Sequence, residues 1–367
     1  MSRVERLAVV GAGLMGASLG LAAKRAGAEV SGYDVDPEVL AEAVERGAVD
    51  RPAGSLAEAV AGAELAVVAV PVAALPATVS AVLGESDAAC TVTDVGSTKA
   101  GVCAAAGSSG RFVGGHPVTG SEARGPAHAT PELFDGASWF LTPTADTDAE
   151  RYRLMHGFVR ALGATPVTVD PLAHDRLVAL TSHLPHAISN LLVNQAGATR
   201  IEGHDPLAAG GGSLRDMTRV AGANPRVWVD IFLDNAEPLA EALAEHRRRL
   251  ERVERAPEQR DAGFLARWIG EAAGNRSRLL AQRFREPGQL HRVRVHVPDR
   301  PGVLAGITQA LSGEEINIED FELQHMSPER GGVLTLLVGG AEAAGRAAEL
   351  LEAQGYSALV AAELGEG

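Results

Sequence analysis

A histidine loop is the part of this chain best suited to move a proton. His116 lies between Gly115 and Pro117, just past an expected strand end. Imidazole titrates near neutral pH, so it can take the proton of an alcohol whose carbon loses a hydride. The alternative is a turn histidine without a role. Its place at the carboxyl end of a strand, in a chain that begins as a nucleotide-binding protein does, favours the catalytic interpretation.

That beginning is a glycine-rich loop. Gly11, Gly13 and Gly16 form G-x-G-x-x-G directly after an expected strand and at the start of an expected helix. The first glycine permits a tight turn, the second lets the backbone approach a pyrophosphate, and the third lets the helix pack closely. The helix N-terminus then faces the phosphates. We expect dinucleotide contacts from this loop and from the ends of two other strands: Gly11, Gly13, Leu14, Met15, Gly16, Val70, Pro71 and Ser97.

Asp34 ends the second expected strand and bears on the choice of cofactor. A carboxylate there accepts hydrogen bonds from ribose hydroxyls and repels a 2′-phosphate. No arginine follows directly in residues 35–37. The pattern favours NAD over NADP. The alternative is a carboxylate that only caps the turn before Asp36 and Pro37.

Three further groups could bind a substrate. Ser97, between a strand and a helix, is either a hydrogen-bonding partner of a substrate hydroxyl or a helix N-cap. Ser182 and His186, spaced by four in an expected helix over residues 174–198, share one face, and Pro185 is expected to kink the helix there. His183 lies on another face and is interpreted as structural.

An arginine pair supplies the cationic group that an acidic substrate needs. Arg215 and Arg219 are one turn apart, and a guanidinium binds a carboxylate with two hydrogen bonds. Asp216 and Glu122 are candidates to hold such an arginine. A surface ion-pair network is the alternative. Trp228, four residues before Phe232, is more typical of a core or dimer contact.

The elements that position these residues indicate three domains: residues 1–169, 170–287 and 290–367. The first alternates strand-like runs (7–10, 29–33, 65–70, 91–95, 112–114, 139–141 and 165–169) with helices, which predicts an α/β Rossmann domain with a mainly parallel sheet. The second is all-α, with helices expected over 174–198, 225–254 and 261–284, and is expected to form a dimer. The third has the order βαββαβ, a ferredoxin-like arrangement.

Composition limits the classes of partner. The net charge of −14 argues against nucleic acid, and it means that an anionic substrate needs a local cationic pocket. The apolar runs are too short to span a membrane, and no secretory leader precedes the first strand. The two cysteines, Cys90 and Cys103, have no metal-ligand spacing. We therefore expect a cytoplasmic protein without a metal.

Residues 5–235 resemble prephenate dehydrogenase, on the motifs GAGLMG, DVGSTK, GHPVTGSE, HDRLVALTSHLPHA and LRDMTRVAGANPRVWVDIF. The resemblance implies oxidative decarboxylation of prephenate to 4-hydroxyphenylpyruvate with reduction of NAD. It implies that His116 accepts the proton of the ring hydroxyl, that Ser97 bridges this hydroxyl and the nicotinamide, and that Arg219 binds the ring carboxylate. The other implied roles concern the pocket: Ser182 and His186 face the substrate side chain, Ser121 lines the pocket, Glu122 and Asp216 brace Arg219, and Trp228 reaches the neighbouring subunit's pocket.

Residues 291–367 resemble an ACT domain, a small regulatory module that often binds amino acids. The resemblance implies tyrosine as a feedback inhibitor, held by residues around a helix start and on the next strand: Asp299, Pro301, Gly302, Val303 and Asn317. A module that only helps oligomerisation is the alternative.

Other activities are weighed against this resemblance. Arogenate dehydrogenase would use the aminated substrate with the same machinery, and the sequence leaves that choice open. A 3-hydroxy-acid dehydrogenase would need a lysine in the helical domain, and no lysine follows Lys99. A non-catalytic sensor of NAD and amino acids would leave His116 and Arg219 without a role.

Overall fold

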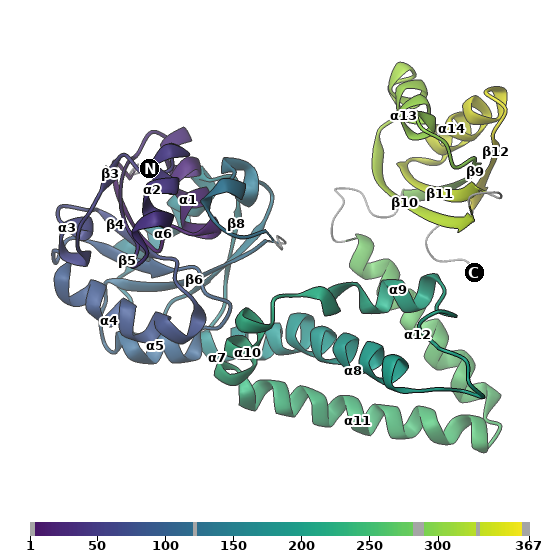
Figure 1. Ribbon diagram of the computed structural model, residues 1–367, viewed down its shortest axis with the longest axis horizontal. Helices are drawn as coiled ribbons and strands as arrows, with labels where there is room; N and C mark the ends of the chain where they lie inside the picture. Colours follow the sequence, from purple (N-terminus) through teal and green to yellow (C-terminus); the bar gives the residue numbers. More distant parts are fainter. Residues whose placement is uncertain (1–3, 120–122, 282–289, 328–330, 362–367) are drawn as a thin grey trace. The chain divides into compact units, whose positions relative to one another are not determined.

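The computed structural model describes residues 4–119, 123–281, 290–327 and 331–361 (Figure 1). The chain forms two compact units, residues 1–247 and 248–367. Each unit is described by itself. Two residues predicted to belong to the substrate pocket, Ser121 and Glu122, lie outside the described residues.

The first unit is built on an eight-stranded sheet of order β3-β2-β1-β4-β5-β6-β7-β8. Strands β1 to β6 are parallel, β7 is antiparallel to β6, and β8 is parallel to β7. The expected mainly parallel sheet is thereby confirmed. The strands are β1 (Arg6–Val10), β2 (Glu29–Tyr33), β3 (Arg51–Pro52), β4 (Leu65–Val68), β5 (Thr91–Asp94), β6 (Phe112–Val118), β7 (Ser138–Thr142) and β8 (Thr165–Thr168).

Helices cover both faces of this sheet, which is why its central strands are continuous apolar runs. Helices α1, α2 and α6 contribute side chains to one core, and α3, α4 and α5 contribute to the other; Figure 1 shows the helices around the sheet. The helices are α1 (Leu14–Arg25), α2 (Pro37–Glu45), α3 (Leu56–Val60), α4 (Leu75–Glu85), α5 (Ala100–Ala106) and α6 (Ala149–Ala161), with short 3₁₀ turns η1 (Val72–Ala74), η2 (Pro126–His128) and η3 (Pro131–Phe134).

Strand β6 corrects the expectation that His116 lies past a strand end. The strand continues through Val118, and His116 pairs with Phe140 of β7. Only its first two residues pair with β5, so the second half extends beyond the end of that neighbour. Two glycines and a proline look like strand breakers in the sequence, yet the antiparallel pairing with β7 carries the strand past them. His116 therefore stands on a rigid element.

The helical part of the first unit begins with a helix that contains a π-helical turn. Asp170 caps it by accepting the amide of Ala173 at 2.9 Å, and Pro171 occupies its first turn. The predicted single helix over 174–198 therefore starts earlier than expected, at Pro171, and is interrupted by a π-helical turn that ends shortly before Pro185. The segments are α7 (Pro171–Val178), the π-helical η4 (Ala179–His183) and α8 (Leu184–Ala198).

The helix expected over residues 225–254 is two helices that meet at Asn235. This buried side chain donates to the Asp175 carbonyl at 2.8 Å and lies 3.0 Å from Nδ1 of His183, so it ties the junction to the preceding helices. The remaining segments are α9 (Gly212–Thr218), the 3₁₀ turn η5 (Arg219–Gly222), α10 (Pro225–Asp234), α11 (Ala236–Glu258) and α12 (Ala262–Ala281).

The helices of the first unit leave many large apolar side chains exposed. Leu180 is 60% exposed, Leu191 62% and Leu233 72%, although all three lie on regular or near-regular helices. Such surfaces are typical of subunit interfaces rather than of isolated monomers. No helix among the described residues is long and apolar enough to cross a membrane.

The second unit ends in a four-stranded antiparallel sheet of order β10-β11-β9-β12. Helices α13 and α14 lie against the sheet (Figure 1), and their side chains form one core with it. The order of elements is the expected βαββαβ: β9 (Leu290–Val297), α13 (Val303–Gly313), β10 (Ile318–Ser327), β11 (Gly331–Gly339), α14 (Ala341–Ala353) and β12 (Ser357–Ala361).

Candidate active site

The carboxyl ends of β1, β4 and β5 lie level with one another. Val10 pairs with Val68, and Val68 pairs with Asp94. The loops that follow these strands therefore leave the same edge of the sheet. The chain order also reverses between β1 and β4, and such a switch point is where open α/β sheets bind ligands. The glycine loop, Val70–Pro71 and Ser97 all follow strands that end at this edge.

The glycine loop has the geometry that a dinucleotide requires. Gly11 has φ +96°, and a Cβ there would lie 2.4 Å from the carbonyl oxygen of Ala69. A Cβ on Gly16 would lie 1.8 Å from the carbonyl oxygen of Gly11. At Gly13, by contrast, a Cβ would meet nothing within 4 Å, and no side chain caps α1. Two glycines are needed by the protein itself, and the third leaves open space at a helix N-terminus, where a pyrophosphate fits.

Asp34 braces the glycine loop. Its Oδ2 accepts the amide of Ala12 at 2.7 Å, and its Oδ1 accepts the amide of Asp36 at 2.9 Å. The cap of α2 is Asp36, whose side chain accepts the amide of Glu38. Each carboxylate oxygen accepts more than one hydrogen bond, so the ribose role predicted for Asp34 is compatible with these contacts.

His116 faces a second histidine. Its Nδ1 lies 2.9 Å from Nε2 of His174, and the two rings meet edge to face. Burial, followed by the proximity of His174 and Lys99, holds the pKa of His116 well below its usual range. The imidazole is therefore neutral at physiological pH, which is the state that a proton acceptor needs.

His174 is held by Asp175, its neighbour on α7. Both side chains are buried, and Nδ1 of His174 lies 2.8 Å from Oδ1 of Asp175. The same carboxylate accepts the amides of Lys99 and Ala100, each at 2.8 Å, at the start of α5. The sequence analysis missed this pair. Both residues open the motif HDRLVALTSHLPHA, but the motif by itself gave them no role.

A buried ion pair fixes the strand ends next to His116. Lys99 pairs with Oδ2 of Asp94, and both side chains are fully buried. Asp94 also accepts the amide of Gly96 at 2.8 Å and that of Gly115 at 3.1 Å. The pair therefore ties the end of β5 to β6 directly before His116. The sequence analysis did not assign this role to either residue.

Ser97 does not cap the helix that follows it. Helix α5 begins after Lys99 without a side-chain cap of its own, and Asp175 accepts its first amides instead. The capping alternative is therefore wrong. Ser97 is half-buried at the carboxyl edge of the sheet. Contact with the substrate and the cofactor remains the role predicted for it.

The polar row on α8 lies against an aromatic side chain. His186 stacks on Trp228, with ring centroids 3.5 Å apart, and its Nδ1 lies 3.0 Å from the carbonyl oxygen of Ser182. Burial lowers the pKa of His186, and the proximity of Arg219 adds to this. Burial also lowers the pKa of His183 to about 4, and this side chain is held by Asn235, so its structural interpretation fits its place.

Arg219 lies on the exposed turn η5 and is close enough to His186 to lower its pKa. Among the residues that the structure describes, Arg219 forms no ion pair with Asp216. Bracing by Asp216 therefore stays a prediction, and bracing by Glu122 lies outside the described residues.

Comparison with known proteins identifies the family. Residues 19–168 match the model of the prephenate dehydrogenase nucleotide-binding domain, and residues 170–271 match that of its dimerisation domain. The prephenate dehydrogenase of Bacillus subtilis is 32% identical over 95% of this chain and 96% of its own length. The chain belongs to the prephenate dehydrogenase family. The third match, over residues 291–355, is to the ACT domain, so the expected family and fold are confirmed.

Two solved structures of this family resemble the chain closely. One is prephenate dehydrogenase of Aquifex aeolicus in complex with hydroxyphenyl propionate and NAD⁺, at 28% identity and a TM-score of 0.70, covering 76% of this chain and 99% of that one. The other is arogenate dehydrogenase of Synechocystis, at 29% identity and a TM-score of 0.69, covering 75% and 99%.

The ACT domain of this prephenate dehydrogenase family member brings part of the predicted regulatory site together. Gly302 has φ +88° and precedes α13, with open space where a Cβ would stand. Asp299 and Val303 line a cavity of about 250 Å³ beside it. Pro301 is exposed in the same turn. Asn317 is exposed and donates to Glu319 at 2.7 Å.

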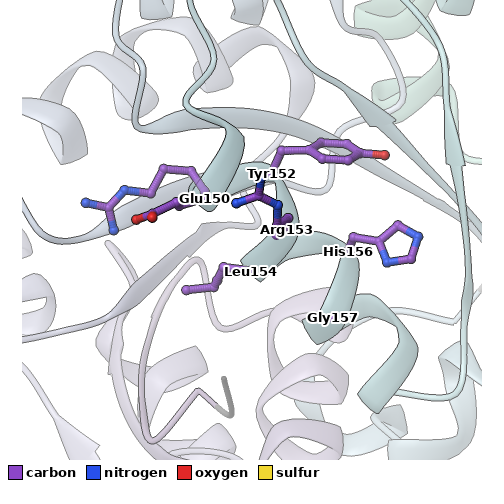
Figure 2. Close-up of a pocket in the computed structure, with 7 residues that line it drawn as sticks. Glu150, Tyr152, Arg153, Leu154, His156 and Gly157 are labelled. Carbon is purple, nitrogen blue, oxygen red and sulfur yellow. The ribbon is translucent and has the colours of Figure 1, made fainter. Parts of the chain in front are cut away.

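A larger cavity than the one in the ACT domain lies elsewhere. It has a volume of about 810 Å³, and the residues that line it all belong to α6. Figure 2 shows Tyr152, His156 and the other labelled residues extending from this one helix. None of them is a predicted site residue, and one helix cannot enclose a substrate. Size alone therefore does not locate the active site here.

Proposed function

We propose that this chain catalyses the NAD-dependent oxidative decarboxylation of prephenate to 4-hydroxyphenylpyruvate. The observation that carries the proposal is His116, a neutral imidazole on a rigid strand. Thr119, three residues further on, contacts the sulfur of Met15 in the glycine loop at 3.9 Å, which brings the histidine strand to the cofactor loop. A base next to a dinucleotide site is the arrangement that oxidation of an alcohol requires.

The residues present fit NAD. The open space at Gly13 and the uncapped N-terminus of α1 receive the pyrophosphate, and Asp34 receives the ribose hydroxyls. Bound there, NAD supplies the hydride acceptor. Met15, Leu14, Val70 and Pro71 surround this edge of the sheet as further cofactor contacts.

His116 accepts the proton of the ring hydroxyl while the hydroxyl-bearing carbon loses its hydride. Ser97, half-buried at the same edge, orients this hydroxyl. The acid that results loses carbon dioxide because the ring becomes aromatic. The protein therefore needs to orient the ring and polarise one hydroxyl, and positioning of this kind accounts for much of the rate gain.

The two carboxylates of prephenate need cationic and hydrogen-bonding partners, because the chain as a whole is acidic. Arg219 binds the ring carboxylate, and Ser182 and His186 face the side chain of the substrate. Their support is that Arg219 lies close to His186, which itself contacts Ser182. Trp228 supports this row through its stack on His186.

The experiment is NADH production by the purified protein with prephenate and, separately, with arogenate. The matched variant is His116→Asn, which keeps a polar side chain and removes the base. Turnover of prephenate that is lost in the variant supports the proposal. Turnover of arogenate alone keeps the mechanism and changes the substrate. No turnover of either, with NAD still bound, refutes the enzymatic proposal in favour of a sensor.

We also propose a homodimer and feedback inhibition by tyrosine. The exposed leucines of the helical part support the dimer. The glycine turn before α13 and the cavity beside it support an amino-acid site in the ACT domain. Addition of tyrosine to the assay above tests inhibition, and sedimentation of the whole chain tests the dimer.

A further inference from the structure

We propose that Asp175 and His174 act as positioning residues, which fix the tautomer of His116 and share the positive charge that it acquires. This inference rests on the proposed function of His116 as the base. It concerns two residues that the sequence analysis did not assign to the reaction.

Asp175, His174 and His116 form a chain of hydrogen bonds that we call the relay. Asp175 fixes the direction in which each of these bonds is donated. An ionised carboxylate only accepts hydrogen bonds. Its contact with Nδ1 of His174 at 2.8 Å therefore requires that this nitrogen carry the hydrogen. The amides of Lys99 and Ala100 approach the same carboxylate, and both can only donate. Three donors converge on one buried group, so its role as acceptor is fixed by the backbone of α5 as well as by the histidine.

The consequence passes to His116. A neutral His174 with its hydrogen on Nδ1 has a lone pair on Nε2, and this nitrogen lies 2.9 Å from Nδ1 of His116. That contact is a hydrogen bond only if His116 carries its own hydrogen on Nδ1. The remaining nitrogen of His116, Nε2, then has the lone pair. The chain of contacts from Asp175 thus leaves a proton-accepting nitrogen at the far end.

The relay also has a role after the proton arrives. The substrate O–H bond breaks, its proton binds Nε2 of His116, and the carbon–hydride electron pair leaves for the nicotinamide. The hydrogen on Nδ1 of His116 can then pass to Nε2 of His174, which places the cation beside Asp175. Burial, His174 and Lys99 all disfavour a cation on His116 itself, so transfer of the hydrogen to His174 moves the positive charge to a ring that lies beside the carboxylate of Asp175. The pair Lys99 and Asp94 is neutral as a unit.

The alternative is that Asp175 only caps α5. Both roles use the same carboxylate, so loss of activity alone cannot separate them. The tautomer of His116 can separate the two roles, because capping of α5 has no effect on that tautomer. The first readout is therefore long-range ¹H–¹⁵N correlation spectroscopy of the histidine rings in the whole chain without substrate, assigned by comparison with His116→Asn.

The variants are Asp175→Asn, His174→Gln and His174→Leu, with Asp170→Asn as the matched control. Asp170 caps the same helix, α7, and takes no part in the relay. Asparagine at position 175 can turn its amide donor toward His174, which would reverse every hydrogen bond as far as His116. Glutamine at position 174 retains an oxygen that can accept from His116, and leucine does not.

In the native protein we expect His116 with its hydrogen on Nδ1. In Asp175→Asn we expect it on Nε2, with kcat lowered by about 10²-fold or more, the size of a general-base contribution, and KM little changed. The fall of kcat/KM toward acidic pH should also disappear in this variant. His174→Gln should retain more activity than His174→Leu, and Asp170→Asn should keep the native tautomer and profile.

Hydrogen on Nε2 of His116 in the native protein overturns the proposal. So does an Asp175→Asn variant that keeps the native tautomer and pH profile but has a lower Tm, since that is the result of a cap alone. If Asp175→Asn does not fold, the tautomer in the native protein and the comparison of glutamine with leucine at position 174 still decide whether the relay operates. The spectra need no substrate, so a wrong reaction assignment is recognised separately, by absence of turnover in the native protein.

Discussion

Replacement of Gly13 by alanine should weaken NAD binding without harming the fold. Gly13 is the N-cap of α1 with φ −65° and ψ −163°, an extended conformation that alanine adopts. A Cβ there meets no protein atom within 4 Å. Reduced freedom of the unfolded chain stabilises such a variant by about 0.4–1 kcal/mol, and alanine is a poorer N-cap than glycine by a comparable amount. The two effects offset each other to within about 1 kcal/mol.

The effect on the cofactor is of another kind. The added methyl group occupies the space through which the pyrophosphate approaches the backbone. We expect a loss of NAD affinity of about tenfold or more, which corresponds to about 1.4 kcal/mol. Titration calorimetry with NAD and thermal unfolding, both on Gly13→Ala and on the native protein, measure the two effects separately. Native affinity in a stably folded variant would refute the placement of the pyrophosphate.

The comparison variant is Gly16→Ala. Its Cβ would lie 1.8 Å from a backbone oxygen that cannot move without distorting the loop. This variant should therefore lose stability together with NAD binding. Equal behaviour of the two variants would show that the loop responds as a whole, and the argument from open space at Gly13 would fail.

Three further predictions concern other parts of the chain. Arg219→Ala should raise KM for prephenate in initial-rate assays and leave Tm unchanged, because the side chain is exposed; a native KM would remove Arg219 from the pocket. The free energy of unfolding should fall as the pH drops from about 6.5 toward 4. In this range His183 is protonated in the unfolded chain but stays neutral in the folded protein, where its pKa is about 4. Urea unfolding at several pH values should show that His183 adds up to about 1.4 kcal/mol per pH unit to the slope of unfolding free energy against pH. The His183→Gln variant should lack this contribution. Leu191→Arg should sediment as a monomer with native secondary structure, since this side chain is 62% exposed; an unchanged dimer would place the interface elsewhere.

The glycine loop could be predicted from sequence because its requirements are local. A turn with positive φ at Gly11 and a close approach at Gly16 leave no other residue type, and a strand and a helix flank them at fixed distances. Asp34 follows from the same spacing. The order of elements in the ACT domain was predicted for a similar reason, since each strand and helix there has its own periodic pattern.

The surroundings of His116 could not be predicted in this way. The sequence places two glycines and a proline around the expected strand end, which local preferences treat as a break. Only the pairing with β7, which comes about 20 residues later, carries the strand through. Asp175 was missed because its three donors come from α5 and from its own neighbour, and contacts between distant elements leave no periodic signal. The break at Asn235 has the same origin, since its partners lie on α7 and the π-helical turn.

The proposed base of this site is assembled from three segments that are far apart in the chain. His116 comes from β6, His174 and Asp175 come from α7, and the amides that hold Asp175 come from the start of α5. Since α7 follows directly after the last strand of the sheet, its packing against α5 is the step that completes the base. A sheet with the glycine loop alone could bind the dinucleotide, but it would leave His116 without the acceptor that fixes its tautomer. On this proposal cofactor binding and proton transfer depend on different contacts, and those for proton transfer lie where α5 meets α7.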